Sequence, residues 1–203
     1  MRTTNVKKMA KLAQSGLLAV LLLGALSCES RTDRQDDGGI VLTISDFDEL
    51  PAQVSVNNPA GPVCSRSSPG GCDLRIGEVV VRSIVKNANT GQSDLMVVEF
   101  SAYEVRFVRR QPGGRTAPPF FQNVFGTIDP GSTTTFNDIP IMGPGQLLTP
   151  PLSDLLFSEG AVDDETGSST IILDAELRFF GRTISGDSVV TDVPARFTLT
   201  ILP

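Results

Sequence analysis

The feature that most restricts the fold of this chain is a strict alternation of apolar and polar residues in its last third. Successive side chains of an extended strand lie on opposite faces, so this pattern predicts strands with one buried face. Residues 169–182 and 193–202 both show it, and the turn sequence "TISGD" between them predicts a hairpin. The side chains expected to face inward are Ile171, Leu173, Ala175, Leu177, Phe179, Val193, Ala195, Phe197, Leu199 and Ile201.

Further strand patterns precede this pair. They cover residues 40–45, 78–86, 95–110, 120–128 and 132–141. In the third of them the apolar phase slips near Ser101, which predicts a bulge or a bend. Turn sequences separate the patterns, and only the segment after Pro150 and Pro151 favours a short helix, over 153–157. We therefore expect an all-β fold, an immunoglobulin-like β-sandwich of about seven to nine strands, in one domain over residues 40–203.

The N-terminal segment has a different character. Basic residues at positions 2, 7, 8 and 11 precede an apolar run from Leu17 to Leu26. A bilayer span needs roughly 20 apolar residues, so this run is too short for a stable transmembrane helix. A buried core helix is an alternative, but the run has no amphipathic period. Because its length and basic flank are typical of a secretory signal peptide, we interpret residues 1–27 as one.

The residues Ala25-Leu26-Ser27-Cys28 resemble the lipobox of bacterial lipoproteins. The resemblance implies that a diacylglyceryl group is attached to the thiol of Cys28 and that cleavage makes Cys28 the mature N-terminus. Leucine is more usual than alanine at the position of Ala25. In that family, Glu29 in place of aspartate after the cysteine favours the outer membrane. The domain that follows resembles the small β-sandwich envelope lipoproteins of environmental bacteria, a likeness that carries no catalytic motif.

Residues 28–39 are polar and charged, and they predict a flexible tether between lipid and domain. From Cys28 onward the chain carries 13 of the 17 basic residues and all 23 acidic ones, a net charge of −10. This balance argues against nucleic acid as a partner and against electrostatic docking on anionic lipid. With the lipobox resemblance, we expect a location in the bacterial cell envelope, facing the periplasm or the cell surface. The lipid is then the membrane contact, and an envelope protein is the expected partner.

Two further cysteines, Cys64 and Cys72, flank the loop "SRSSPGG". In an exported protein, a pair around a flexible turn predicts a structural disulfide. A redox-active pair is the alternative, but such pairs usually lie two residues apart beside a helix. Because the closed loop is short, the bond would contribute about 2 kcal/mol.

The chain has no histidine, and after Cys28 its one lysine is Lys86. This removes Ser-His-Asp and Cys-His chemistry and histidine metal sites, so we expect no enzyme, no catalytic residue and no cofactor. Two acidic runs remain as candidate calcium ligands or as the paired carboxylates of a hydrolase. Both coincide with turn sequences, so solvated turn charges are the simpler interpretation. The candidates are Asp46, Asp48, Glu49, Asp163, Asp164 and Glu165.

Aromatic residues supply the last candidate site. Phe120 and Phe121 are adjacent in a strand pattern, so one of them must face outward or meet another surface. An exposed phenylalanine there would be a partner contact, and a covered loop is the simpler alternative. Two functions remain: a non-catalytic, membrane-anchored module that binds or scaffolds an envelope protein, and a ligand-binding, calcium-binding or hydrolytic protein that uses the acidic loops. An exposed apolar patch would favour the first, and carboxylates converging in a pocket would favour the second.

Overall fold

The computed structural model describes residues 39–48, 53–57, 73–87 and 93–203. The predicted signal peptide and tether, Cys28, Glu49, Cys64 and Cys72 therefore lie outside the described residues. The lipidation and the disulfide stay predictions. Within the described ranges, no helix is long and apolar enough to cross a membrane.

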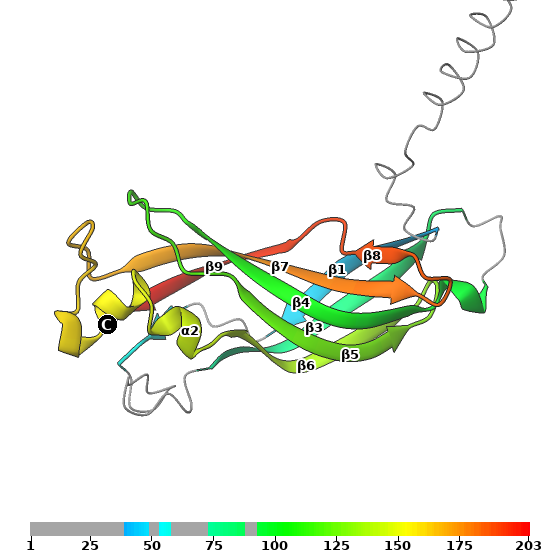
Figure 1. The fold of residues 1–203 in the computed structure, drawn as a ribbon, viewed down its shortest axis with the longest axis horizontal. Coiled ribbons are helices and arrows are strands. Elements are labelled where there is room, and N and C mark those ends of the chain that lie inside the picture. Colours follow the sequence, from blue (N-terminus) through cyan, green and yellow to red (C-terminus); the bar gives the residue numbers. More distant parts are fainter. Residues whose placement is uncertain (1–38, 49–52, 58–72, 88–92) are drawn as a thin grey trace, which may run out of the picture. The chain divides into compact units, whose positions relative to one another are not determined.

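Nine strands in the described ranges form two sheets (Figure 1). The smaller sheet is antiparallel and has the order β1-β3-β6, with β1 Ile40–Asp48, β3 Leu74–Val85 and β6 Thr133–Met142. The larger sheet has the order β2-β9-β7-β4-β5, and β8 pairs with the end of β7. Its strands are β2 Gln53–Ser55, β4 Val98–Arg109, β5 Phe120–Ile128, β7 Ile171–Thr183, β8 Ser188–Val190 and β9 Ala195–Leu202.

The helical elements in the described part of the chain are short. They are the 3-10 turns η2 Asp94–Met96, η3 Leu152–Leu155 and η4 Phe157–Glu159, and the helix α2 Pro144–Leu147. The predicted helix over 153–157 is therefore wrong as a single element. Leu156 has an extended backbone (ψ 140°), so the segment divides into two 3-10 turns on either side of it.

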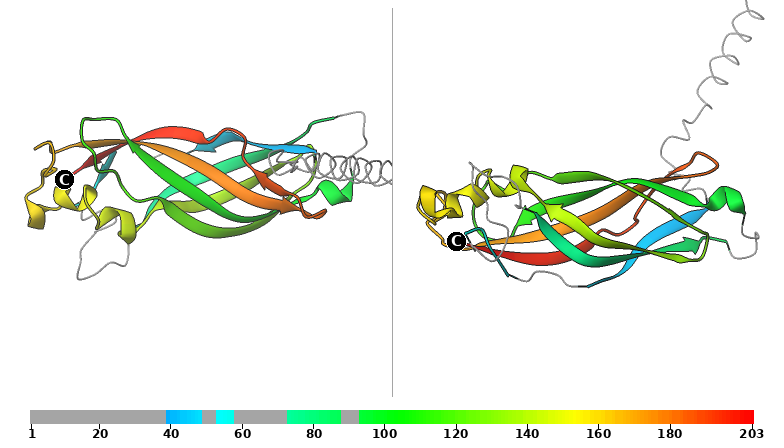
Figure 2. Two further views of the ribbon diagram at one scale, coloured as in Figure 1. Left: turned by 45° about the horizontal axis from the view of Figure 1, so that its top comes forward. Right: turned by 90° about the horizontal axis from the view of Figure 1, so that it is seen from below.

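The two sheets pack face to face as an all-β sandwich, as expected from the alternation, and Figure 2 shows the two layers of strands. Rings from both sheets meet between the layers. Phe179 of β7 is stacked on Phe136 of β6, with 4.9 Å between ring centroids. Phe100 and Tyr103 of β4 pack against the same Phe179 ring at 5.9 and 5.6 Å. These aromatic contacts hold the layers together and fix which side of the larger sheet faces outward.

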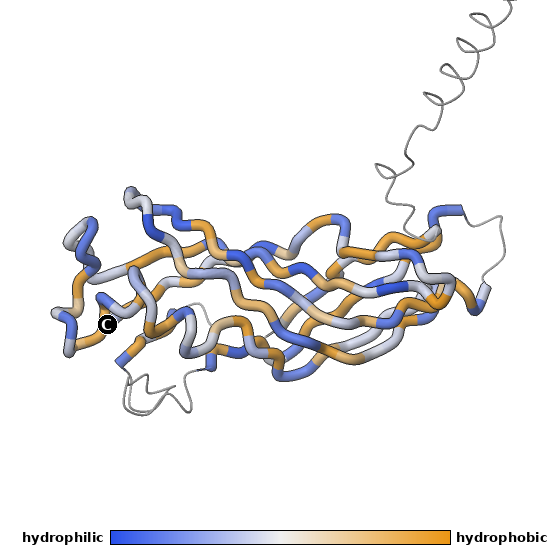
Figure 3. The backbone as a smooth tube through the Cα atoms, in the orientation of Figure 1, coloured by the Kyte–Doolittle hydropathy of each residue, from blue (hydrophilic) through white to orange (hydrophobic). Residues whose placement is uncertain are grey.

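The pairing of the two C-terminal patterns is confirmed, because β7 and β9 are antiparallel neighbours from Ile171 opposite Ile201 to Leu177 opposite Ala195. Figure 3 shows hydrophilic and hydrophobic residues alternating along the strands. One inward assignment is wrong. Val193 is 66% exposed, and β9 begins only at Ala195. Pro194 lies between them and has no N–H to donate to a sheet ladder, which explains the later start.

The predicted phase slip in β4 is confirmed. The register shifts between Phe100 and Ala102 against both neighbouring strands, β5 and β7. The extra residue moves Ala102 opposite Phe180 and Tyr103 opposite the buried Phe179. Ala102 consequently lies on the outer face, and Tyr103 points into the core, where its hydroxyl donates a 2.5 Å hydrogen bond to the Pro140 carbonyl.

Candidate functional site

The outer face of the larger sheet carries three phenylalanines that are not part of the hydrophobic core. The phenylalanines and the valine of β5 alternate between the two faces, so that Phe120 and Val124 pack on the core while Phe121 and Phe125 point outward. Phe121 is 62% exposed and Phe125 is 86% exposed. The third ring, Phe180 of β7, is half-buried, and its centroid lies 6.3 Å from that of Phe121. We call Phe121, Phe125 and Phe180 the aromatic face.

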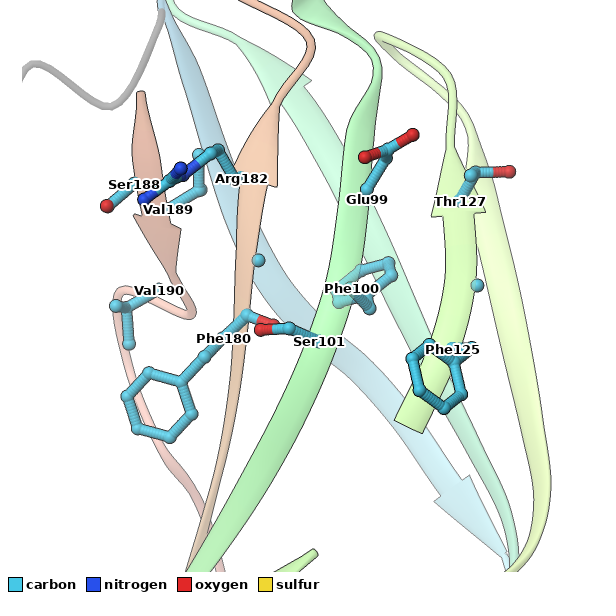
Figure 4. Close-up of a pocket in the computed structure, with 12 residues that line it drawn as sticks. Glu99, Phe100, Ser101, Phe125, Thr127, Phe180, Arg182, Ser188, Val189 and Val190 are labelled. Carbon is cyan, nitrogen blue, oxygen red and sulfur yellow. The ribbon is translucent and has the colours of Figure 1, made fainter. Parts of the chain in front are cut away.

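A groove of about 770 Å³ runs over this part of the sheet. Figure 4 shows Phe180 of β7 and Phe125 of β5 on opposite sides of β4, with Ser101 between them. Ser101 is the residue at the β4 bulge and lines the groove, so the bulge places a small side chain between the two rings. Val190 of β8 lines the same groove beside Phe180.

The rim of the groove is polar and balanced in charge. Glu99 of β4 lies opposite Arg182 of β7 in the sheet, and both side chains are exposed. Ser188 and Thr127 complete this end of the groove. An apolar centre with a polar rim is the arrangement that protein interfaces use, and aromatic residues are enriched at the positions that carry binding energy.

The predicted contact residues Phe120 and Phe121 are therefore separated by the sheet. Phe121 belongs to the aromatic face. Phe120 is half-buried and packs against the core, and its ring centroid lies 6.3 Å from that of Tyr103. Phe125 and Phe180 were not among the predicted site residues, although the same alternation would have placed both of them outward.

The acidic candidates occupy quite different positions. Asp46 and Asp48 lie within β1, because a bulge between Ile44 and Asp46 lets the strand continue past its predicted end. Their assignment to a turn is wrong. Asp46 is exposed, and its carboxylate accepts a 2.9 Å hydrogen bond from the amide of Phe47.

The second acidic run forms an ion network with two arginines. Asp163 is fully buried, so its interpretation as a solvated turn charge is wrong. Its Oδ2 lies 2.7 Å from Nη2 of Arg109, whose side chain is only 3% exposed. Glu165 lies 3.3 Å from the same guanidinium, and Asp164 is exposed to solvent. Thr166 also donates to the Asp163 carboxylate from both its backbone N–H and its hydroxyl.

This network ties together two loops, residues 110–119 and 143–170. Glu165 accepts hydrogen bonds from the backbone amides of Gly114, at 2.8 Å, and of Arg115, at 3.1 Å. Arg115 in turn lies 3.3 Å from Asp154. Gly113 allows the approach: its φ is +137°, and a Cβ there would lie 2.7 Å from the Arg109 guanidinium carbon.

The charges of the network are held in their ionised forms. Burial raises the pKa of Asp163, but the hydrogen bonds from Arg109 and Thr166 and the arginine charge outweigh it, and the pKa falls from 3.8 to about 2. The amides of Gly114 and Arg115 lower the pKa of Glu165 below its usual range. These carboxylates are thus paired with arginines and hydrogen-bonded to backbone amides, and neither of them lines the groove over the larger sheet.

Among the residues that the structure describes, no group of three or more His, Cys, Asp or Glu side chains could hold a metal ion. Together with the position of Asp163 and Glu165, this gives no support to a calcium site in the described part of the acidic runs.

No protein-family model, curated protein or solved structure matches this chain. The immunoglobulin-like character and the lipoprotein resemblance therefore stay predictions, whereas the two-sheet architecture is established by the strand pairing.

Proposed function

We propose that this chain is a lipid-anchored protein of the bacterial envelope whose β-sandwich is a non-catalytic binding module. The observation that carries the proposal is the aromatic face: Phe121 and Phe125 are exposed and Phe180 is half-buried beside the groove. Water contact with such rings is unfavourable, and each ring covered by a partner recovers the free energy of its apolar surface.

The chemistry of the groove indicates the kind of partner. Its centre is aromatic, and its rim offers one acidic and one basic side chain, Glu99 and Arg182. A partner protein that inserts an apolar side chain between Phe125 and Phe180 would fit it. The absence of histidine supports a module without catalytic machinery. The residues before Cys28 support the anchor, and Glu29 favours the outer membrane by resemblance.

The anchor is tested at Cys28. Cys28→Ser is expected to abolish incorporation of labelled fatty acid and to leave the chain at the full precursor mass, because the thiol is the proposed acylation site. The measurement is metabolic labelling followed by mass spectrometry of the purified chain. Cys64→Ser is the matched control and should be labelled like the parent. Undiminished labelling of the Cys28 variant would refute the anchor.

The binding surface is tested at Phe125. With the tagged full chain as bait in detergent-solubilised envelopes, we expect Phe125→Ser to weaken capture of the partner about 30-fold, as loss of an aromatic hot spot of about 2 kcal/mol implies. Phe157→Ser is the control, because Phe157 is also exposed, at 71%, but lies in η4 away from the groove. Equal capture by both variants would remove the aromatic face from the proposal.

A further inference from the structure

The strand β5 leaves one backbone edge open. It ends the larger sheet, and no other strand of the described ranges pairs with its second edge. Its sequence, FFQNVFGTI, contains no charged residue and no proline over nine residues. An uncharged edge of this length offers a row of unpaired N–H and C=O groups that another strand can bind.

The other strands that end the two sheets carry the features that usually prevent such pairing. β1 contains Asp46 and Asp48, and β6 contains Asp138 and Pro140. β2 is only three residues long. The contrast singles out β5 as an edge suited to a partner.

The outward residues of β5 are symmetric about Asn123. Phe121 lies two residues before it and Phe125 two residues after it, and all three are exposed. If two copies of the strand pair antiparallel about Asn123, Phe121 of each copy lies opposite Phe125 of the other. Aromatic cross-strand pairs of this kind stabilise the pairing of two strands. Because the strand carries no charge, two copies meet there without the repulsion expected of an acidic chain.

The antiparallel orientation is also the one that preserves the faces of the sheet. A twofold axis perpendicular to the sheet keeps both aromatic faces on the same side and both inner faces toward their own cores. Parallel pairing through the same edge would turn one copy over, so that the exposed Phe125 of one sheet would continue into the buried side of the other.

We infer that the open edge of β5 pairs antiparallel with β5 of a second copy of this chain, with Asn123 on the twofold axis. The inference goes beyond the proposed function, because the partner in this contact is a second copy of the chain and not a different protein. It joins two larger sheets into one and unites two aromatic faces into a single surface. Attachment to one membrane, which rests on the proposed anchor, would raise the effective concentration of the two copies.

Disulfide trapping at the axis tests the arrangement. We expect Asn123→Cys, in the full chain in envelope membranes under mild oxidation, to form a covalent dimer of this chain, because directly opposite Cβ atoms lie about 4.5–5.5 Å apart. Thr127→Cys is the matched control on the same face of β5. Its two copies would lie eight residues apart along the strands, about 27 Å, and should not cross-link above the level of the parent chain.

Three results would overturn the inference. They are no dimer with Asn123→Cys, equal dimer with both variants, or a covalent product with a different protein in place of a second copy. The last result would still agree with the proposed binding function, which is measured by capture of a different protein and not by the covalent dimer.

A second variant covers the case in which the cysteine disturbs folding. Asn123→Lys places two like charges opposite each other on the axis, so the purified full chain in detergent should change from dimer to monomer by sedimentation analysis. Thr127→Lys should remain dimeric. A parent chain that is monomeric at every concentration would also contradict the inference.

Discussion

Replacing Arg109 with methionine is expected to lower the free energy of unfolding by about 3–5 kcal/mol, because it leaves the carboxylate of Asp163 buried without its counter-charge. Both side chains are almost completely buried, at 3% and 0% exposure, and they lie 2.7 Å apart. The measurement is chemical denaturation at neutral pH. The neighbouring arginine provides the control: Arg110 pairs with Asp174 at 2.9 Å, but its side chain is 60% exposed. Arg110→Met should therefore cost less than about 1 kcal/mol.

The double variant Arg109→Met/Asp163→Leu distinguishes two contributions to the free energy of unfolding. One is the cost of leaving a buried charge unpaired, and the other is the net stabilisation by the ion pair. Arg109 Nε and Asp163 Oδ1 have no hydrogen-bond partner among the described residues, so the native network is itself incompletely satisfied. Apolar side chains of similar size should consequently restore most of the lost stability. A double variant as unstable as Arg109→Met would show that the pair holds the two loops in a way that packing cannot replace.

The same pair makes the protein sensitive to acid, and the sign follows from the lowered pKa of Asp163. In the unfolded chain its pKa is near 3.8, and in the folded chain it is about 2. The folded state therefore binds fewer protons, and its stability contribution is complete above the unfolded pKa and is lost as the pH falls. For the parent chain we expect a decline of about 2 kcal/mol from this group between roughly pH 5 and pH 2. The double variant lacks this carboxylate. Its free energy of unfolding should therefore fall by about 2 kcal/mol less than that of the parent chain over the same pH range.

Two adjacent phenylalanines should give opposite results. Phe179→Ala is expected to destabilise the fold by about 3–5 kcal/mol, because the ring is completely buried and its removal leaves a cavity between the sheets. Three aromatic rings lose a neighbour at once, those of Phe100, Tyr103 and Phe136. Thermal or chemical denaturation measures this effect directly.

Phe180→Ala removes the next residue, which lies on the outer face beside Phe121. Its stability loss should be about 1 kcal/mol or less, and its main effect should be weaker capture of the partner, as for Phe125→Ser. If Phe180→Ala were as destabilising as Phe179→Ala, the ring would belong to the core and the aromatic face would shrink to β5. If it left partner capture unchanged, the groove beside β8 would lie outside the interface.

The strand pattern was predictable because alternation is a local property. Whether Phe179 or Phe180 faces inward depends only on the period of two and on the apolar residues that precede them, so the core face of β7 follows from its own sequence. The bulge near Ser101 was visible for the same reason, as a break in that period. The outward position of Phe125 could have been found by the same argument.

The ion network could not be predicted in that way. Arg109 and Asp163 are 54 residues apart, and nothing near either residue indicates the other. The acidic run at Asp163 has the composition of a solvated turn, and it does form a turn. The fold, however, brings the buried Arg109 into contact with it. Burial reverses the expected chemistry, because a carboxylate in that position must be paired, and the charge of Asp163 is compensated by Arg109.

By itself, the sequence determined the fold class, the inward face of most strands, and the lack of histidine chemistry, since each of these depends on residue types and on spacing along one strand. It also carries the resemblance at Cys28. Only the tertiary structure decided which edge of the sheet stays open, which phenylalanines from β5 and β7 lie beside one groove, and which charges cancel. The physical reason is that these properties depend on the order of strands in the sheet and on the register between them. Both are set by packing between segments that are distant in the chain.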